Sequence, residues 1–246
     1  MILKRLFMAL KHPGSILYPN SWNNDVFIEY LKSRGAKIGE NTRFISPNNC
    51  SIDPGRLDYI SIGKNCCFSV VSILAHDYSW YTLLGSKGDM LPDAGGNVTI
   101  GDNCFIGYQA LIMKGVTIGD NVIIGARSVV SGGVNIPSNT VWAGCPARQI
   151  CTIEELYQKR VKNRVSDAIY RRDHLRQTKQ RDPLINEMGM FCYLFLERTL
   201  ENYNLYVKDL EFNGIKDSDI VREYFFNSKP FFSSYEEFLN YNYNED

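Results

Sequence analysis

The sequence predicts an all-β solenoid of very short strands, with a short helical segment before it and an α-helical extension after it. Apolar residues recur at every sixth position in the middle of the chain, glycine often follows them, and helical patterns replace this repeat on both flanks. With 246 residues and a hydrophobic fraction of 44%, the chain is large and apolar enough to bury such a core.

The segment 1–35 is predicted to be helical. Its first residues place apolar side chains on one stripe, with basic residues beside it. Such a stripe packs against the body of a protein or rests on a membrane surface, so we expect membrane contact to be peripheral at most. A second short helix is predicted from Asp25 to Ser33. The stripe consists of Ile2, Leu3, Leu6, Phe7 and Leu10.

The repeat occupies residues 36–150. A large apolar residue opens each group of six, and a small or branched residue stands at the fifth position, so two side chains in six are predicted to point inward. An α-helix needs apolar spacings of three and four, and a strand needs a spacing of two, so neither explains the period. The large residues are Ile100, Ile106, Ile112, Ile118, Ile124, Val130, Ile136 and Trp142, and the small ones are Cys104, Ala110, Val116, Val122, Ser128, Val134 and Thr140.

An earlier block has the same period but a different phase. Its predicted inward residues are Ile38, Phe44 and Cys50, then Ile62, Phe68 and Leu74, and Arg56 interrupts them. Because the two blocks are out of phase, the segment 77–97 is predicted to be a loop thrown out of the solenoid.

The run IGDNCFIGYQALIMKGVTIGDNVIIGARSVVSGGVNIPSNTVWAGCPARQI resembles the hexapeptide-repeat acyltransferases, especially the maltose, galactoside and polysaccharide O-acetyltransferase branch. The resemblance extends over 36–150. It implies a left-handed parallel β-helix with three sides per coil, and a homotrimer with active sites between subunits. The left-handed winding rests on the resemblance alone, because parallel crossovers are usually right-handed.

The resemblance also implies transfer of an acetyl group from acetyl-CoA to a hydroxyl of a sugar or glycan, of the cell-surface polysaccharide type. That reaction needs a base for the hydroxyl proton and hydrogen-bond donors for the oxyanion. Of the three histidines, His12 and His174 lie in charged segments and are expected at the surface. His76 opens the loop in ILAHD, where the family keeps its catalytic histidine, and a histidine that only caps the loop is the alternative.

Two further roles at the catalytic centre have candidates, the partner of the His76 ring and the oxyanion donor. The ring of His76 needs a partner that fixes its tautomer. Asp77 is one candidate, and a backbone carbonyl is favoured, because neighbours in an extended segment point to opposite faces. The resemblance places the oxyanion donor at the backbone N–H of Tyr108, whose phenol alternatively narrows the acyl channel or covers the coil surface.

Coenzyme A needs an apolar groove, partners for the pantetheine amides and cations for the phosphates. The resemblance places Gly125 and Ala126 along the pantetheine arm, Ser131 further along, and Arg148 at the phosphate end. This chain has Ser131-Gly132 where relatives often have Thr-Lys, and Cys151 where they have a second basic residue. The candidates to replace these cations are Lys114, Arg127 and the basic segment after Lys159.

Composition limits the partners and the compartment. Equal numbers of basic and acidic residues, 27 each, give no global attraction to nucleic acid. The seven cysteines form neither a CxxC pair nor a secreted-scaffold spacing, which predicts reduced thiols, a cytoplasmic location and no metal site.

The extension 151–246 is predicted to be α-helical. A capping box of Thr152 and Glu155 opens a helix that continues to about Gln180, and Asp182-Pro183 then breaks it. The remainder is acidic and rich in tyrosine and phenylalanine, and its role stays open between a cap on the trimer, part of the acceptor pocket and a docking surface.

Other functions compete with this interpretation. A serine or antibiotic acetyltransferase is the main alternative, because the loop and the flanks choose the acceptor. A carbonic anhydrase on the same repeat needs three histidines around zinc, and only His76 lies in the repeat. A non-catalytic solenoid scaffold, for which His76 is dispensable, is the alternative from another class.

Overall fold

A computed structural model describes residues 20–21, 23–212 and 218–242, so the predicted apolar stripe and His12 lie outside the described residues. The chain divides into two compact units, Met1–Tyr157 and Gln158–Asp246. The first unit contains the repeat, and the second contains most of the C-terminal extension.

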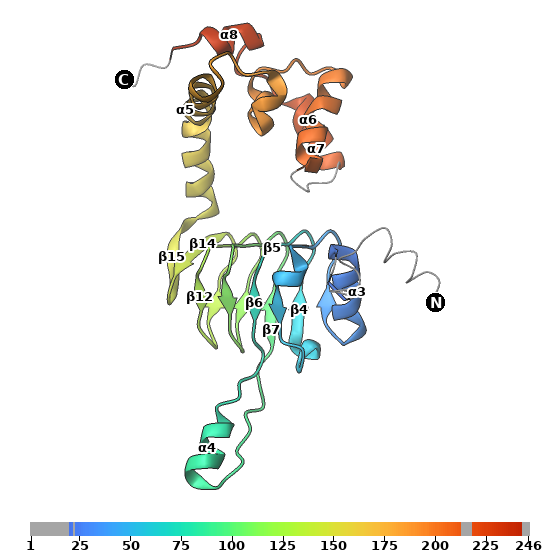
Figure 1. The fold of residues 1–246 in the computed structure, drawn as a ribbon, viewed down its shortest axis with the longest axis vertical. Coiled ribbons are helices and arrows are strands. Elements are labelled where there is room, and N and C mark those ends of the chain that lie inside the picture. The colour runs from blue at the N-terminus through green and yellow to red at the C-terminus, as the bar shows by residue number, and fades with distance from the viewer. Residues whose placement is uncertain (1–19, 22, 213–217, 243–246) are drawn as a thin grey trace, which may run out of the picture. The chain divides into compact units, whose positions relative to one another are not determined.

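The described strands of the first unit form three sheets, which we call A, B and C and which the chain visits in turn (Figure 1). From β1 to β11 each strand pairs in parallel with the strand three places later, and β14 also pairs antiparallel with β15. Sheet A contains β1 (Lys37–Ile38), β4 (Ile60–Ile62), β7 (Val98–Ile100), β10 (Thr117–Ile118) and β13 (Asn135–Ile136). Sheet B contains β2 (Arg43–Ile45), β5 (Cys67–Ser69), β8 (Phe105–Ile106), β11 (Ile123–Ile124), β14 (Thr140–Gly144) and β15 (Ala147–Thr152). Sheet C contains β3 (Ser51–Ile52), β6 (Ser72–Ile73), β9 (Leu111–Ile112) and β12 (Val129–Val130).

The hexad predicted from Ile100 onward is confirmed. Ile100 pairs with Ile118, and Ile118 with Ile136, so one coil takes three hexads. The large inward side chains from Ile100 to Ile136 are buried, and Trp142 packs half-buried against them. Glycine follows them because the coils approach closely: a β-carbon on Gly107 would lie 2.6 Å from the Ala126 backbone nitrogen.

The predicted phase of the earlier block is wrong at two positions. Cys50 is only half-buried and Leu74 is exposed, while Ile52 and Ile73 are buried and paired in register. A 3-10 helix, η1 (Pro47–Asn49), lengthens the turn before β3, so the inward residue comes two positions later than the hexad predicts. The turn before β6 is one residue shorter than the hexad predicts.

The corner between sheets A and B is built the same way in successive coils. Each of its turns holds an asparagine in the left-handed region, with φ between 55° and 63°. The side-chain amide of each asparagine except the last donates to the asparagine of the next coil, over distances from 2.9 to 3.3 Å. Asparagine tolerates this backbone conformation better than most residues, so one residue type satisfies both the turn and the ladder. The ladder consists of Asn41, Asn65, Asn103, Asn121 and Asn139.

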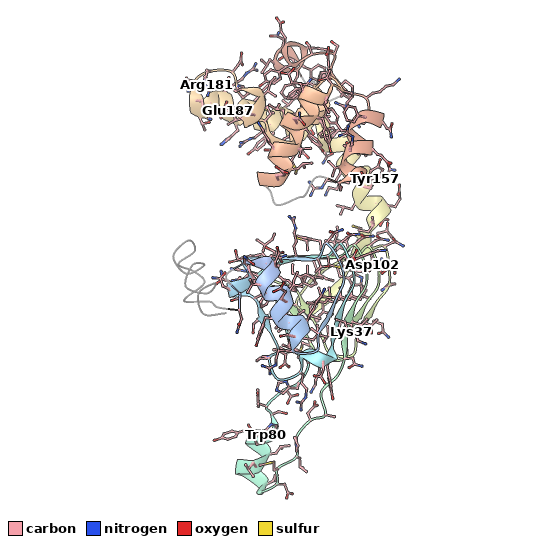
Figure 2. All side chains as sticks on the ribbon, turned by 90° about the vertical axis from the view of Figure 1, so that its right-hand side faces the viewer. Lys37, Trp80, Asp102, Tyr157, Arg181 and Glu187 are labelled. Carbon is pink, nitrogen blue, oxygen red and sulfur yellow. The ribbon has the colours of Figure 1, made fainter. Side chains whose placement is uncertain are left out.

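The α-helices α3 (Asn24–Ser33) and α4 (Trp80–Lys87) also lie in the first unit. The helix α3 begins at Asn23, whose side chain accepts a hydrogen bond from the Val26 amide, and it buries Phe27 and Leu31 against the first coil. The helix α4 lies in the loop between β6 and β7, which projects from the sheets (Figure 1), and none of its side chains is buried. Figure 2 shows Trp80 on this projecting loop.

The C-terminal extension is helical, as predicted. Its first helix, α5 (Ile153–Lys179), opens with the predicted capping box: the Glu155 carboxylate accepts from the Thr152 amide at 2.7 Å, and the Thr152 hydroxyl accepts from the Glu155 amide at 3.1 Å. Further elements are the 3-10 helices η3 (Ile185–Glu187) and η4 (Gly189–Leu194) and the helices α6 (Leu200–Phe212), α7 (Asp219–Asn227) and α8 (Tyr235–Asn240). Aromatic side chains such as Phe225, Phe232 and Phe238 fill the core of the second unit. Among the described helices, none combines the length and the apolar character that crossing a membrane requires.

Candidate active site

The turns between sheets C and A, which we call the C–A corner, differ from coil to coil. The turn after β3 begins with Asp53 and includes the 3-10 helix η2 (Leu57–Tyr59). The turn after β6 contains His76 and becomes the projecting loop, the turn after β9 contains Lys114, and the turn after β12 begins with Ser131. These groups therefore come from successive coils along one edge of the unit.

His76 is held by the carboxylate of Asp53. Its Nδ1 lies 2.5 Å from Asp53 Oδ2, and the same oxygen accepts from the backbone amides of Ala75 at 2.9 Å and His76 at 3.1 Å. The other carboxylate oxygen accepts from the Gly55 amide at 3.0 Å. Asp53 is buried, with 2% of its side chain exposed, whereas 15% of the His76 side chain is exposed. The buried Asp53 carboxylate thus fixes the Nδ1 side of the ring, while part of the His76 side chain stays exposed.

The hydrogen bonds to Asp53 favour its ionised form. Burial raises the pKa of this carboxyl, but the His76 ring and the amides of Ala75 and Gly55 together outweigh burial, so the pKa lies below its usual range. An ionised carboxylate on Nδ1 selects the tautomer in which Nδ1 carries the proton, which leaves the lone pair on Nε2.

The surroundings of the ring leave Nε2 available. No described residue donates to or accepts from this nitrogen. The ring meets the edge of Tyr78 with centroids 4.8 Å apart. On another side lies Gly55, where a β-carbon would approach His76 Cε1 to 3.2 Å and Nε2 to 3.7 Å. Glycine at this position therefore keeps the space beside the ring open.

The ring partner differs from both groups that the sequence suggested. One carboxylate oxygen of Asp77 accepts from the amide and hydroxyl of Ser79, at 2.9 and 2.6 Å, and the other binds the ammonium of Lys114. Asp53 contacts His76 Nδ1 in place of Asp77 or a backbone carbonyl. The reason is geometric, because Asp77 points away from the ring along the extended chain.

Sequence reasoning missed Asp53 because the hexad count ran through Cys50 and Arg56. In the structure Ser51 pairs with Ser72 and Ile52 with Ile73, so Asp53 precedes His76 by one coil. The repeated Ser-Ile pair in SIDPG and SILAH was the available signal, and it aligns the two turns directly.

The predicted oxyanion donor and most of the predicted coenzyme residues lie at a different corner. Tyr108, Gly125 and Ala126 are in the turns between sheets B and C, and Arg148 pairs with Ala143 close to Gly125. The Tyr108 carbonyl accepts from the Arg127 amide at 2.7 Å, and no described residue accepts from the Tyr108 amide. Ser131 is at the C–A corner with His76. Within one chain, His76 therefore lies at a different corner from Tyr108, Gly125, Ala126 and Arg148.

Two of the candidate replacement cations, Lys114 and Arg127, have partners within the first unit, whereas the basic segment after Lys159 belongs to the second unit. Lys114 binds the carboxylates of Asp77 and Asp93, and Arg127 Nε donates to the Gln109 side chain at 3.2 Å. Arg148 donates to the Ala147 carbonyl at 3.0 Å and is otherwise exposed. In the described part of the chain, no three His, Cys, Asp or Glu side chains are grouped so as to hold a metal ion.

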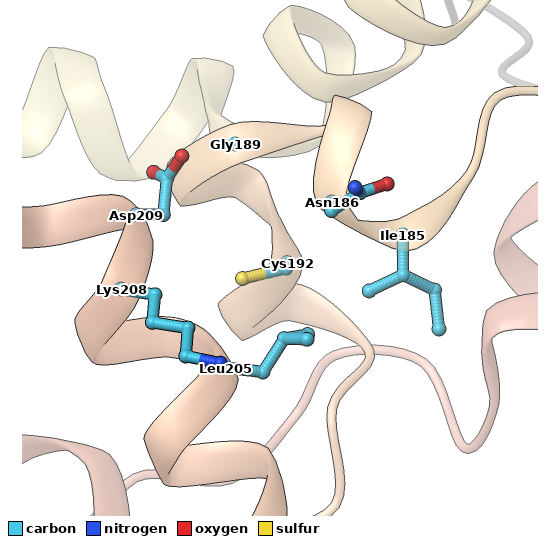
Figure 3. A pocket seen from close by; sticks show the side chains of 7 residues that line it. All are labelled: Ile185, Asn186, Gly189, Cys192, Leu205, Lys208 and Asp209. Atoms are coloured by element: carbon cyan, nitrogen blue, oxygen red, sulfur yellow. The ribbon is translucent and has the colours of Figure 1, made fainter. Parts of the chain in front are cut away.

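The second unit contains a separate cavity of about 480 Å³ (Figure 3). Side chains of η3, η4 and α6 surround it, and none of the predicted site residues does. The lining residues are Ile185, Asn186, Gly189, Cys192, Leu205, Lys208 and Asp209.

Comparison with known proteins identifies the repeat. Residues 96–132 match the sequence model of the family described as "Bacterial transferase hexapeptide (six repeats)". The chain carries the hexapeptide repeat of bacterial transferases. This match confirms the predicted repeat, whereas no curated protein sequence matches the chain.

Solved structures similar to this hexapeptide-repeat chain include three acetyltransferases. A hexapeptide-repeat acetyltransferase from Vibrio cholerae O1 biovar eltor, complexed with acetyl coenzyme A, is 21% identical with a TM-score of 0.34, over 48% of this chain and 61% of that one. A maltose O-acetyltransferase from Clostridium difficile 630 is 28% identical with a TM-score of 0.33, over 52% and 75% of the two chains. A soybean serine acetyltransferase complexed with serine is 23% identical with a TM-score of 0.34, over 47% and 40%. The chain thus spans 61% of the Vibrio cholerae protein and 40% of the soybean protein.

Proposed function

We propose that this chain is an acetyl-CoA-dependent O-acetyltransferase that acts on a hydroxyl of a sugar or glycan, with His76 as its general base. The observation that supports this proposal most directly is the buried Asp53 carboxylate on His76 Nδ1, beside an Nε2 that no described residue binds. A histidine that served only as a loop cap would not need a buried charge to select its tautomer.

The proposed reaction is direct transfer without an acyl-enzyme. Nε2 of His76 takes the proton of the acceptor hydroxyl while that oxygen bonds to the thioester carbonyl carbon. The oxyanion receives a hydrogen bond from the Tyr108 amide of a neighbouring subunit. When the carbon–sulfur bond breaks, His76 returns its proton to the departing thiolate, and Asp53 stabilises the imidazolium in the interval.

The proposed assembly is a homotrimer of left-handed β-helices with active sites between subunits. The position of His76 at the C–A corner, away from Tyr108, Gly125, Ala126 and Arg148, favours sites that are completed by a second chain. In such a site Gly125 and Ala126 of one subunit line the pantetheine arm, and Arg148 binds the phosphate end.

The acceptor class can be tested by measuring release of free thiol from acetyl-CoA with a panel of acceptors. The panel contains free sugars, sugar nucleotides, oligosaccharides, serine and hydroxylated antibiotics. We expect acceptor-dependent release with a sugar or glycan. Release only with serine or with an antibiotic would replace the proposed acceptor, and no release with any acceptor would contradict the enzyme function.

The shared site predicts complementation between two inactive variants. His76→Ala removes the base, and Ala126→Trp blocks the pantetheine groove at an exposed position. Mixed trimers contain sites that carry neither change, so a mixture is expected to recover up to about a quarter of wild-type turnover, the random-assembly limit for two-chain sites. A mixture that never exceeds its parents, despite subunit exchange verified by mass spectrometry, would show that each chain carries a complete site.

A further inference from the structure

The projecting loop leaves the C–A corner and returns to it over a narrow base. The first leg begins at Ala75, and the second leg returns through Gly96, whose amide donates to the Ala75 carbonyl at 2.8 Å. The legs are so close that a β-carbon on Gly95, which has φ +84°, would lie 2.6 Å from the same carbonyl. His76 stands at the foot of the first leg.

Each leg carries an aspartate that binds its own turn with one oxygen. Oδ1 of Asp77 accepts from the Ser79 amide at 2.9 Å, and Oδ1 of Asp93 accepts from the Gly95 amide at 2.5 Å. The second oxygen of each carboxylate binds the same ammonium, that of Lys114, which lies 2.6 Å from Asp93 Oδ2. One cation from the next coil therefore joins both legs.

Electrostatics makes the three groups interdependent. The two carboxylates repel each other, since Asp77 on its own raises the pKa of Asp93. Lys114 outweighs this repulsion and lowers the pKa of both carboxyls, while they raise the pKa of the lysine. Between 30% and 42% of each side chain is exposed, so solvent weakens the attraction, but the cation still separates two like charges on adjacent legs.

Lys114 is also placed to hold the legs against the body of the unit. It follows β9, the strand that pairs with β6, from which the first leg departs. A β-carbon on Gly96 would lie 2.9 Å from the Gly115 backbone nitrogen, so the second leg packs directly on the lysine turn.

We propose that Lys114, through its contacts with Asp77 and Asp93, is a positioning residue that fixes the loop base and thereby the placement of His76. This inference rests on the proposed acetyl transfer. It differs from the role that the sequence suggested for Lys114, binding of the coenzyme phosphates, because the ammonium is already engaged by two carboxylates.

The test compares Lys114→Met with the conservative Lys114→Arg, whose guanidinium can bridge two carboxylates. Misplacement of a catalytic group by about 1 Å costs about 100-fold in rate, so we expect kcat of Lys114→Met to fall by about 10- to 100-fold. The KM for acetyl-CoA is expected to stay unchanged, and Lys114→Arg to keep most of the turnover. A raised KM with little change in kcat would instead assign Lys114 to the phosphates and overturn the proposal.

A second variant and a readout independent of activity separate this proposal from the proposed function. Adding Asp93→Asn to Lys114→Met removes the like-charge repulsion, and we expect it to recover part of the lost turnover. Amide hydrogen exchange over 75–97 is expected to rise in Lys114→Met and to fall back in the double variant. Unchanged hydrogen exchange in Lys114→Met would overturn the positioning role of Lys114, even in an active enzyme. If the exchange follows these expectations but the protein has no acetyltransferase activity, the proposed function is rejected. The contacts of Lys114 with Asp77 and Asp93 would then still fix the loop base.

Discussion

The corner between sheets A and B, which we call the A–B corner, repeats one residue type from coil to coil, whereas the C–A corner differs in every coil. At the A–B corner every described coil uses an asparagine in the left-handed region, and the side chains bond to one another in a ladder. At the C–A corner successive coils present Asp53, His76 with its loop, Lys114 and the Ser131 turn. The ladder at the A–B corner joins successive coils in a regular stack. At the C–A corner the same stacking brings different side chains close together.

For Asp53→Asn, at the C–A corner, we expect a loss in kcat of about 100-fold or more, because the amide no longer selects the reactive tautomer of His76. Asp58→Asn, an exposed change in the same turn, is the matched control and is expected to leave kcat unchanged. Steady-state kinetics of the two variants checks this. Equal activity of Asp53→Asn and wild type would remove Asp53 from the mechanism.

Asp53 also predicts a pH dependence of stability. Since its pKa is lowered in the folded chain, its contribution to the free energy of unfolding is complete above the unfolded pKa of about 3.9 and is lost as the pH falls through the folded value. The stability difference between wild type and Asp53→Asn is therefore expected to shrink in acid. Urea unfolding at neutral pH and below about pH 3.9 measures it, and a difference that grows in acid would contradict the assigned direction.

The A–B corner is tested by Asn121→Ala, which we expect to lower stability without lowering the kcat of the folded protein. Alanine loses the ladder bonds to Asn103 and Asn139 and pays about 1 kcal/mol or more for the left-handed backbone, giving a loss of about 2 kcal/mol. Asn121→Gly keeps the backbone conformation and loses only the ladder, so its loss is expected to be smaller. Urea unfolding compares the variants, and equal losses would mean that the backbone conformation contributes nothing.

The regular coils could be predicted from the sequence because their inward residues obey one spacing from Ile100 to Ile136. The first coils could not be predicted to the residue, since the added 3-10 helix before β3 and the shortened turn before β6 move the inward positions away from Cys50 and Leu74. The same shift concealed Asp53. His76 was recognisable from its place in ILAHD, but the partner of its ring depends on pairing between coils, which a local spacing does not specify.

The partners of the cations also could not be predicted from a local spacing. Lys114 and Arg127 are basic residues near the predicted site, and the sequence suggests them equally as ligands of the coenzyme phosphates. Their engagement depends on side chains far away in the chain, Asp77 and Asp93 for the lysine and Gln109 for the arginine. Only the stacking of coils brings these groups together.

In the proposed reaction the C–A corner supplies the general base, His76. The turnover of His76→Ala, measured with the best acceptor and beside its urea unfolding midpoint, tests this most directly. We expect kcat to fall by about 100- to 10,000-fold, the usual contribution of a general base, while the midpoint and acetyl-CoA binding stay close to wild type. Nearly full turnover in a folded His76→Ala protein would contradict the account.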